Sequence, residues 1–371
     1  MRSLIFHFNQ VINNYEGTVP LVHFLKNYFK LHPVLGSRDR KLISAMVYSW
    51  YRCSRAVGND EMLNDLMAQW LNEKIWASKS FIGWLREVHP GVILDLNALL
   101  PYDLELSDGM IKEAWLGSML EQPELFIRIR KEKDLLIQLL EKSGIPYTFI
   151  TGNCLSLPNG AKIDSKLPQE CYVVQDASSQ QTGAWFKPRK NELWYDCCSG
   201  AGGKALLLKD LEPGVRLTVS DKRESIIHNL QQRFRLYKHD LPVAHVTDVA
   251  SRALLDKALG TKKFDNIICD APCSGSGTWA RTPEQLYFFK PETINEYSSL
   301  QQTIATNAAR HLKPGGRLIY ITCSVFRQEN EMVVDGLVKL AGLKLISSQI
   351  INGISNHADS MYIAELIRNE H

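Results

Sequence analysis

The C-terminal half of the chain alternates short apolar segments with longer stretches that have helical spacing. Each apolar segment ends at or near an acidic residue or a cysteine. When that last residue is included, the segments are 193–196, 217–221, 243–248, 264–270 and 318–323. Strands that alternate with helices form a parallel sheet, because each helix returns the chain to the same edge. The pattern therefore predicts an α/β, Rossmann-like domain with a mostly parallel, doubly wound sheet over residues 171–371.

The N-terminal residues follow a different pattern. Apolar residues recur at four-residue spacing, as in Ile43, Val47 and Tyr51, and prolines and glycines separate these stretches, which indicates a set of helices. We therefore expect an all-α domain at residues 1–112. Residues 113–170 contain two strand-like segments around one helical stretch, which predicts a small α+β module.

The composition is that of a globular protein, with 45% hydrophobic and 22% charged residues in a chain of 371. The formal net charge of +3 does not by itself indicate a nucleic-acid partner, although a local basic face is enough to bind phosphates. The eight cysteines contain no CxxC pair, and no Cys/His group has zinc-ligand spacing. We therefore expect neither a disulfide framework nor a metal site.

The start of the chain lacks the apolar core and small-residue cleavage site of a signal peptide. No apolar stretch approaches the ~20 residues that a membrane span requires. We therefore expect a cytoplasmic protein with reduced thiols and no membrane association.

The segment Asp196–Lys204 reads DCCSGAGGK and connects the first predicted strand to a helix. Glycines let a backbone turn sharply and approach a ligand, and a helix N-terminus favours negative charge. A phosphate-binding P-loop is excluded, since Cys198 takes the first glycine position and Ala205 replaces the magnesium-binding hydroxyl. A dinucleotide fingerprint that begins at Gly200 would also need glycine at position 205.

Two acidic residues follow the next strands. Asp221 closes the second predicted strand, where nucleotide-binding sheets place the acid that binds ribose hydroxyls. The alternative for Asp221 is a cap on a helix that begins at Lys222. Asp248 after the third strand has the features of an ordinary N-cap when it is considered alone.

Two cysteines end strands of the same predicted sheet. FDNIICDAPCSGSG at residues 264–277 contains Asp270 and Cys273, and LKPGGRLIYITCS at residues 312–324 contains Cys323. At strand ends, backbone amides and helix starts lower thiol pKa values, so we expect both to be reactive. Cys269 lies inside the strand and is expected to pack as a small hydrophobic residue.

These motifs resemble those of the Sun/Nop/RsmB family of RNA cytosine-5 methyltransferases. The likeness runs in order through the C-terminal half; besides the motifs above it includes VVQDASSQ at 173–180, FRQENE at 326–331 and DSMYIAEL at 359–366. The N-terminal helices are similar to the NusB-like RNA-binding domain of some bacterial members, through residues 17–29 and 36–41. Residues 113–170 resemble the small RNA-binding module that precedes the catalytic domain in this family.

The resemblance implies a class I methyltransferase domain that binds S-adenosylmethionine. Asp221 would bind the ribose, Asp248 would lie near the adenine, and Asp270 would face both cofactor and cytosine. The implied cofactor-binding residues are Cys198, Ser199, Gly200, Ala201, Gly202, Gly203, Lys204, Asp221, Asp248 and Asp270. The middle of this loop departs from the family, which commonly has Cys-Ala-Ala-Pro-Gly-Gly-Lys.

The resemblance also implies the catalytic residues. Cys323 would be the nucleophile that adds to carbon 6 of cytosine, Cys273 would help to release the product, and Asp270 would neutralise charge that develops near N3. DNA cytosine-5 enzymes instead use the Pro-Cys cysteine as nucleophile, so the presence of both cysteines favours an RNA substrate.

The RNA partner is expected to be ribosomal RNA, with transfer RNA as the second candidate, and the protein is expected to be a monomer. Arg38, Arg40 and Lys41 are implied to contact RNA phosphates; the alternative is a solvated helix face. After the DAPCSGSG motif the family usually has two basic residues, a Pro-Glu or Pro-Asp step and a tryptophan. This chain has Ala280–Tyr287 at that place, and we expect the difference to alter substrate contacts. A catalytically weak RNA-binding or ribosome-assembly factor remains the alternative function.

Overall fold

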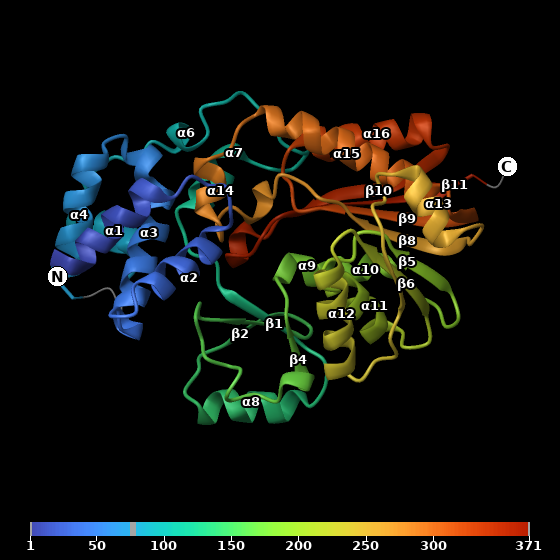
Figure 1. The fold of residues 1–371 in the computed structure, drawn as a ribbon, viewed down its shortest axis with the longest axis horizontal. Helices are drawn as coiled ribbons and strands as arrows, with labels where there is room; N and C mark the ends of the chain where they lie inside the picture. Colours follow the sequence, from blue (N-terminus) through green and yellow to red (C-terminus); the bar gives the residue numbers. More distant parts are fainter. Residues whose placement is uncertain (1, 75–78, 370–371) are drawn as a thin grey trace. The chain divides into compact units, whose positions relative to one another are not determined.

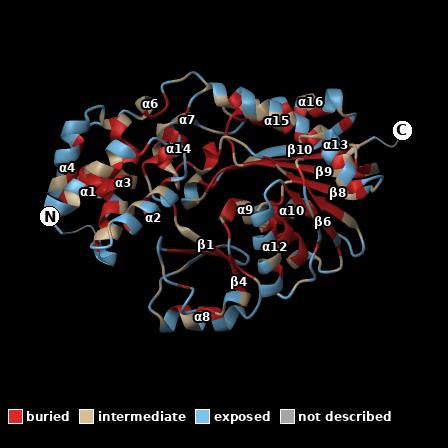
Figure 2. Cartoon of the chain, in the orientation of Figure 1, coloured by how far each residue is buried: buried red, intermediate tan, exposed pale blue. Residues whose placement is uncertain are grey.

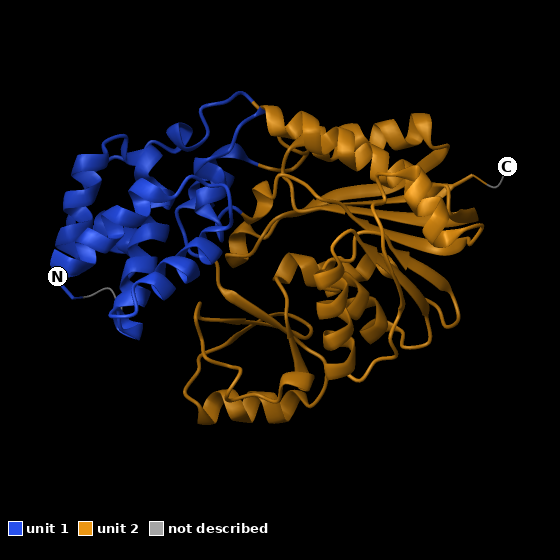
Figure 3. Ribbon diagram, in the orientation of Figure 1, with its two compact units in different colours: residues 1–103, 111–122, 279–291 blue, residues 104–110, 123–278, 292–371 orange. Residues whose placement is uncertain are grey.

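The computed structural model describes residues 2–74 and 79–369, which form two compact units (Figure 1). The first, called the helical unit here, comprises residues 1–103, 111–122 and 279–291 (Figure 3). The second, called the sheet unit, comprises residues 104–110, 123–278 and 292–371. The chain therefore passes between the units several times, in place of the three consecutive segments that the sequence suggested.

The helical unit contains helices of 4 to 21 residues. They are α1 (Arg2–Asn14), α2 (Leu21–Leu31), α3 (Ser37–Val57), α4 (Asp60–Asn72), α5 (Phe81–Val88), α6 (Leu96–Leu99), α7 (Lys112–Met119) and α14 (Pro283–Tyr287). Ile43, Val47 and Tyr51 are all buried on α3, as their spacing predicted. The longest helix, α3, ends at Val57 and is capped by Gly58, whose left-handed φ of 68° lets its amide donate to the Ser54 carbonyl. The predicted all-α N-terminal region is confirmed.

Residues 279–291 belong to the helical unit, although their sequence lies within the predicted methyltransferase segment. Glu284 on α14 is buried and accepts a hydrogen bond from the Leu21 amide at the start of α2. Arg52 is also buried, and its guanidinium donates to the carbonyls of Met119, Glu121 and Ala280. These long-range contacts bring three separate stretches of chain into one core.

The sheet unit begins with a small antiparallel sheet in the order β2-β3-β1-β4. Its elements are β1 (Leu125–Ile129), α8 (Lys133–Lys142), β2 (Thr148–Thr151), β3 (Cys154–Leu157), η1 (Gln169–Cys171) and β4 (Tyr172–Val174). Alternate residues of β1 pack on Leu136 and Leu140 of α8 in one apolar cluster. The predicted α+β module is therefore confirmed.

A seven-stranded sheet follows, in the order β10-β11-β9-β8-β5-β6-β7 (Figure 1). The elements are α9 (Ala177–Gln181), α10 (Gly183–Phe186), β5 (Leu193–Asp196), α11 (Gly203–Leu211), β6 (Arg216–Asp221), α12 (Glu224–Leu236), β7 (Val243–Val246), α13 (Arg252–Leu259), β8 (Phe264–Asp270), η2 (Ser276–Thr278), α15 (Glu292–Ala309), β9 (Leu312–Thr322), η3 (Arg327–Glu329), α16 (Glu331–Leu340), β10 (Leu343–Ile351), η4 (Ile354–Asn356) and β11 (Met361–Arg368). Strands β5 to β9 pair in parallel, which confirms the five predicted segments. Strand β11 is antiparallel to both β9 and β10, and neither β10 nor β11 was predicted.

Helices cover both faces of the large sheet. Trp194 and Tyr195 are adjacent on β5 and point to opposite faces, so Trp194 packs with α11 and α12 while Tyr195 packs with α13 and α15. Figure 2 shows the central strands β8 and β9 as buried. This confirms the doubly wound α/β fold. Among the helices of residues 2–74 and 79–369, none combines the length and apolarity needed to cross a membrane.

Candidate active site

The carboxyl ends of β5, β6 and β8 meet at one edge of the sheet, as parallel pairing requires. A cavity of about 390 Å³ opens at this edge. Of the residues predicted to bind the cofactor, those that line it are Cys198, Gly200, Asp221, Asp248 and Asp270. Thr247, Pro272 and Tyr297 also line it, and the sequence had suggested no role for these three.

The glycine-rich loop turns tightly between β5 and α11. Gly200 and Gly202 have φ values of 51° and 84°, a left-handed region that other residues rarely adopt. A Cβ at Gly202 would lie 2.9 Å from Leu230, whereas one at Gly200 would meet nothing within 4 Å. Gly202 is thus required by packing beneath the loop, and Gly200 leaves open space at the cavity wall.

Hydrogen bonds fix the other residues of the loop. Both the amide and the hydroxyl of Ser199 donate to the Ser220 carbonyl on β6, at 2.9 and 3.1 Å. The carbonyl of Ala201 accepts from Arg233 at 2.7 Å, and Gly203 is the first residue of α11. The loop is therefore anchored to the neighbouring strand and to α12.

Asp221 is 8% exposed and binds Arg223 in three ways. Its Oδ1 accepts from the Arg223 amide and Nε, both at 2.9 Å, and its Oδ2 accepts from Nη2 at 3.0 Å. Burial alone would raise the pKa of Asp221, but the bonds from Arg223 outweigh it and lower the pKa. Helix α12 begins at Glu224 with Arg223 as its N-cap, so Asp221 is not the N-cap that the alternative required.

Asp248 is not the N-cap of the helix that follows it, as its sequence position had suggested. Its Oδ1 accepts from the Ala250 amide at 2.9 Å, while Ser251 is the N-cap of α13 and accepts from the Leu254 amide. Asp248 therefore shapes the turn before the helix, with its side chain at the cavity wall.

Lys204 connects the glycine-rich loop to the end of β8. This side chain is 7% exposed, and its Nζ lies 3.2 Å from Asp270 Oδ2 and donates to Ser179 Oγ at 2.9 Å. Ser179 lies on α9, within the VVQDASSQ motif, for which the sequence had suggested no role.

Cys273 and Cys323 are neighbours, although they are distant in sequence. Their Sγ atoms are 3.2 Å apart, and both residues are half-buried. The hydrogen bond to Cys323, followed by burial, raises the pKa of Cys273 well above its usual value, so the expectation of a lowered pKa was wrong for this cysteine. The reason is that a thiol donating to a neighbouring sulfur is stabilised in its protonated form. Cys269 is fully buried, as predicted.

The three predicted RNA-binding residues lie in the first two turns of α3, in the helical unit. Arg38 and Lys41 are exposed, whereas Arg40 is half-buried and donates its Nε to the Leu35 carbonyl at 2.8 Å. Within residues 279–291, Tyr287 packs its ring against Trp50 and Tyr51. The segment that departs from the family's usual pattern therefore contributes to the core of this unit.

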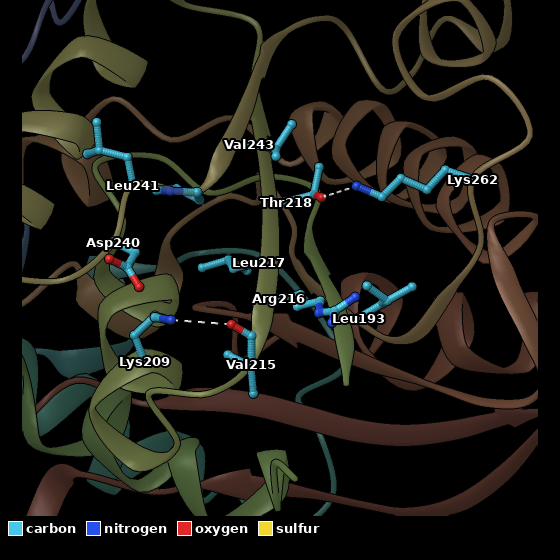
Figure 4. A pocket seen from close by; sticks show the side chains of 11 residues that line it. Leu193, Lys209, Val215, Arg216, Leu217, Thr218, Asp240, Leu241, Val243 and Lys262 are labelled. Atoms are coloured by element: carbon cyan, nitrogen blue, oxygen red, sulfur yellow. Dashed lines mark hydrogen bonds between the residues drawn. The ribbon is translucent and has the colours of Figure 1, made fainter. Parts of the chain in front are cut away.

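A second hollow, of about 330 Å³, lies at the amino ends of β5, β6 and β7 (Figure 4). There Lys209 donates to the Val215 carbonyl, and Lys262 donates to Thr218 Oγ1 at 2.8 Å (Figure 4). None of the predicted site residues lines this hollow. Ligands of open α/β sheets bind at the carboxyl ends of the strands, so the 390 Å³ cavity is the candidate active site.

Comparison with known proteins identifies the family of this chain. The profile of the family described as 16S rRNA methyltransferase RsmB/F matches residues 183–367. The ribosomal RNA small subunit methyltransferase B of Shewanella oneidensis is 30% identical over 269 residues, which are 68% of this chain and 62% of that protein. The chain thus spans about three fifths of the length of such relatives.

Two solved structures share the fold. The crystal structure of PH0851 has a TM-score of 0.72 at 19% identity and covers 94% of each chain. NSun6 from Pyrococcus horikoshii, solved with SFG, has a TM-score of 0.61 at 17% identity and covers 70% of this chain and 94% of its own. By its profile match and its relatives, the chain belongs to the 16S rRNA methyltransferase RsmB/F family, a family of S-adenosylmethionine-dependent RNA methyltransferases.

Proposed function

We propose that this protein transfers a methyl group from S-adenosylmethionine to carbon 5 of a cytosine in RNA, through a covalent bond between Cys323 and carbon 6. The observation that carries the proposal is the pair of Sγ atoms, 3.2 Å apart, beyond two neighbouring parallel strands of a Rossmann-like sheet. Methylation at nitrogen or oxygen requires no thiol, whereas carbon 5 of cytosine becomes nucleophilic only after addition at carbon 6.

The residues at the carboxyl edge fit S-adenosylmethionine. The cavity wall combines an open glycine backbone at Gly200 with the acidic side chains of Asp221 and Asp248, which suit an amino acid and a ribose. When bound, the cofactor supplies an electrophilic methyl group. Arg223 keeps Asp221 ionised and oriented, ready to accept hydrogen bonds from hydroxyl groups.

Cys323 acts as the nucleophile in this proposal. Its thiolate forms an S–C6 bond, and the electron pair of the C5=C6 double bond moves so that carbon 5 gains nucleophilic character. Asp270 is held by Lys204 at the same edge, where its carboxyl group in the protonated form donates to N3 and stabilises the negative charge of the adduct.

Cys273 completes the cycle. The hydrogen bond to Cys323 raises its pKa, and adduct formation removes that acceptor, so we expect the pKa of Cys273 to fall and its proton to pass to water. Once carbon 5 carries the methyl group, the Cys273 thiolate accepts the proton of carbon 5, the C5=C6 double bond re-forms and the S–C6 bond breaks. Cys323 leaves as a thiolate and Cys273 is again protonated, which restores the starting state.

Ribosomal RNA is the proposed substrate, because the curated relatives are named ribosomal RNA small subunit methyltransferase B. Arg38 and Lys41, exposed near the start of α3, are proposed to contact its phosphates, with Arg40 placed beside them. A local basic face of this kind compensates for the small net charge of the whole chain.

The test is transfer of labelled methyl from S-adenosylmethionine to total RNA that lacks the modification, with the product mapped by position. We expect 5-methylcytosine at a defined ribosomal position with the wild type and with Cys171→Ala, a control in the small α+β module, and none with Cys323→Ala. Label on transfer RNA, and none on ribosomal RNA, would show that transfer RNA is the substrate in place of ribosomal RNA. Retained transfer by Cys323→Ala would refute the covalent mechanism.

A further inference from the structure

We propose that Glu329 is a positioning residue for the two cysteines. Its carboxyl group binds Ser274 and Ser324, the residues that directly follow Cys273 and Cys323, and so holds both cysteine loops against each other. The inference deepens the proposed function, on which it rests, by naming the group that sets the geometry of the thiol pair.

The Glu329 carboxyl group accepts four hydrogen bonds in this region. Its Oε1 accepts from the Ser274 amide at 2.8 Å and from Gln301 Nε2 at 3.0 Å. Its Oε2 accepts from the hydroxyls of Ser274 and Ser324, each at 2.5 Å. One carboxyl group thus contacts both cysteine loops and helix α15, which carries Gln301.

The backbone of Glu329 is itself held in place. Its carbonyl accepts from the Tyr320 hydroxyl on β9 at 2.7 Å. The adjacent Asn330 donates to the Ser324 carbonyl at 2.9 Å and accepts from Thr322. Because Thr322 and Ser324 flank Cys323, the carboxyl group acts from a rigid support and not from a mobile loop.

The two cysteine loops are packed without space for adjustment. The amide of Gly277 donates to the Cys323 carbonyl at 2.8 Å, and a Cβ at Gly277 would lie 2.9 Å from that oxygen. Ser276 and Ser324 also share a hydrogen bond of 3.1 Å. A change in either loop therefore alters the separation of the sulfur atoms.

Glu329 is completely buried, and among the residues that the structure describes no lysine, arginine or histidine forms an ion pair with it. A buried carboxyl group without a cation is costly unless hydrogen bonds compensate for it. Two of its four donors, the Ser274 amide and Gln301 Nε2, cannot act as acceptors. Glutamine at position 329 can keep its oxygen for these two donors, but its NH₂ would then face the hydroxyls of Ser274 and Ser324, which now donate to Oε2 and would have to turn and accept.

The charge of Glu329 also acts on Cys273. After the hydrogen bond to Cys323, burial and the charge of Cys323, the charge of Glu329 contributes to the raised pKa of Cys273. The group therefore helps to keep Cys273 protonated while Cys323 reacts, which gives the two cysteines different roles.

Glu331 is a matched control in the same motif. Its carboxyl group accepts from Ser107 Oγ at 3.0 Å and from the Asp108 amide at 3.2 Å, and it contacts neither cysteine loop. Glu331→Gln therefore changes the same chemical group two positions away without touching the thiol pair.

The experiment measures alkylation of the full chain by iodoacetamide over a series of pH values, without RNA or cofactor, with peptides containing Cys273 and Cys323 quantified by mass spectrometry. We expect Cys323 to react faster in the wild type. Glu329→Gln should lower the ratio of Cys323 to Cys273 alkylation by about tenfold, the value of a hydrogen bond to a charged group, whereas Glu331→Gln should leave it unchanged. An unchanged ratio in Glu329→Gln, or an equal change in Glu331→Gln, would overturn the proposal.

Serine variants decide the matter if Glu329→Gln does not fold. Ser274→Ala and Ser324→Ala each remove a hydroxyl that donates to Glu329 from one cysteine loop, so each should change the ratio of Cys323 to Cys273 alkylation. No effect of either serine variant would overturn the proposal. Since alkylation requires no methyl transfer, altered reactivity in a protein that does not methylate RNA would refute the proposed function and leave the role of Glu329 intact.

Discussion

The guanidinium of Arg223 holds the carboxylate of Asp221 through two hydrogen bonds of 2.9 and 3.0 Å at the wall of the candidate cofactor cavity. The arginine side chain is 58% exposed and the aspartate side chain 8% exposed, so the buried carboxylate is held by a guanidinium that lies largely in solvent. Its geometry leaves Asp221 ionised and fixed in orientation, as an acceptor for a diol would need to be.

Asp221→Ala should weaken S-adenosylmethionine binding by about tenfold or more, because the variant lacks a charged acceptor for two hydroxyls. Arg223→Ala should weaken binding less, since it frees the carboxylate without removing it. Isothermal titration calorimetry measures both affinities, with Asp256→Ala on α13 as the control. Equal affinity of Asp221→Ala and wild type would leave Asp221 with a structural role alone.

Cys273→Ala should accumulate a protein–RNA adduct that survives denaturation, because the S–C6 bond forms but no thiolate at position 273 takes up the carbon 5 proton. A denaturing gel with labelled RNA detects the adduct. Cys53→Ala in the helical unit serves as the control. An adduct seen with Cys323→Ala and absent from Cys273→Ala would require the two roles to be exchanged.

Asp210 should make the sheet unit sensitive to acid. Burial would raise its pKa, but hydrogen bonds from His239 and Arg130 and the charges of Arg128 and Arg130 outweigh it, so the pKa of Asp210 is lowered in the folded state. A carboxyl group with a depressed folded pKa contributes stability above its unfolded pKa, and this contribution is lost as the pH falls below about 4.

Urea unfolding between pH 7 and pH 3 tests this expectation. Asp210→Asn should destabilise the protein by about 3–5 kcal/mol at pH 7, since it leaves two buried arginines without their partner. The difference from wild type should shrink towards pH 3. Asp256→Asn, whose side chain is 42% exposed, should show neither effect. A difference for Asp210→Asn that does not change with pH would contradict the linkage.

The double variant Arg38→Ala/Lys41→Ala should bind RNA more weakly, with a smaller dependence on salt. For each phosphate that the variant no longer binds, the slope of log affinity against log salt should become shallower by about 0.7 to 0.9. Fluorescence anisotropy at several salt concentrations measures the slope, with Lys339→Ala on α16 as the control. A slope equal to that of the wild type would reduce these residues to a solvated helix face.

Local patterns were enough to predict most of the sheet unit. The strands β5 to β9 are apolar segments followed by polar residues, and a strand's period and length are properties of neighbouring residues. Strand β10 was missed because it lies at the sheet edge, with most of its residues exposed and without the apolar character of a buried strand. Segment 279–291 was assigned to the wrong neighbours because its contacts, such as Glu284 with Leu21, join residues far apart in the chain.

The fold class and the carboxyl edge as the place of the candidate site follow from the order of residues along the chain, because the predicted site residues follow strands whose direction is set by the crossover rule. The roles proposed for Asp221, Asp270, Cys273 and Cys323 come from the family resemblance of their motifs. The folded chain was needed to find that the two sulfur atoms lie 3.2 Å apart and that the hydrogen bond to Cys323 raises the pKa of Cys273. It was also needed to identify Glu329 as the group between both cysteine loops. Hydrogen bonding, burial and pKa depend on which distant segments become neighbours, and that arrangement is set by the packing of the whole sheet.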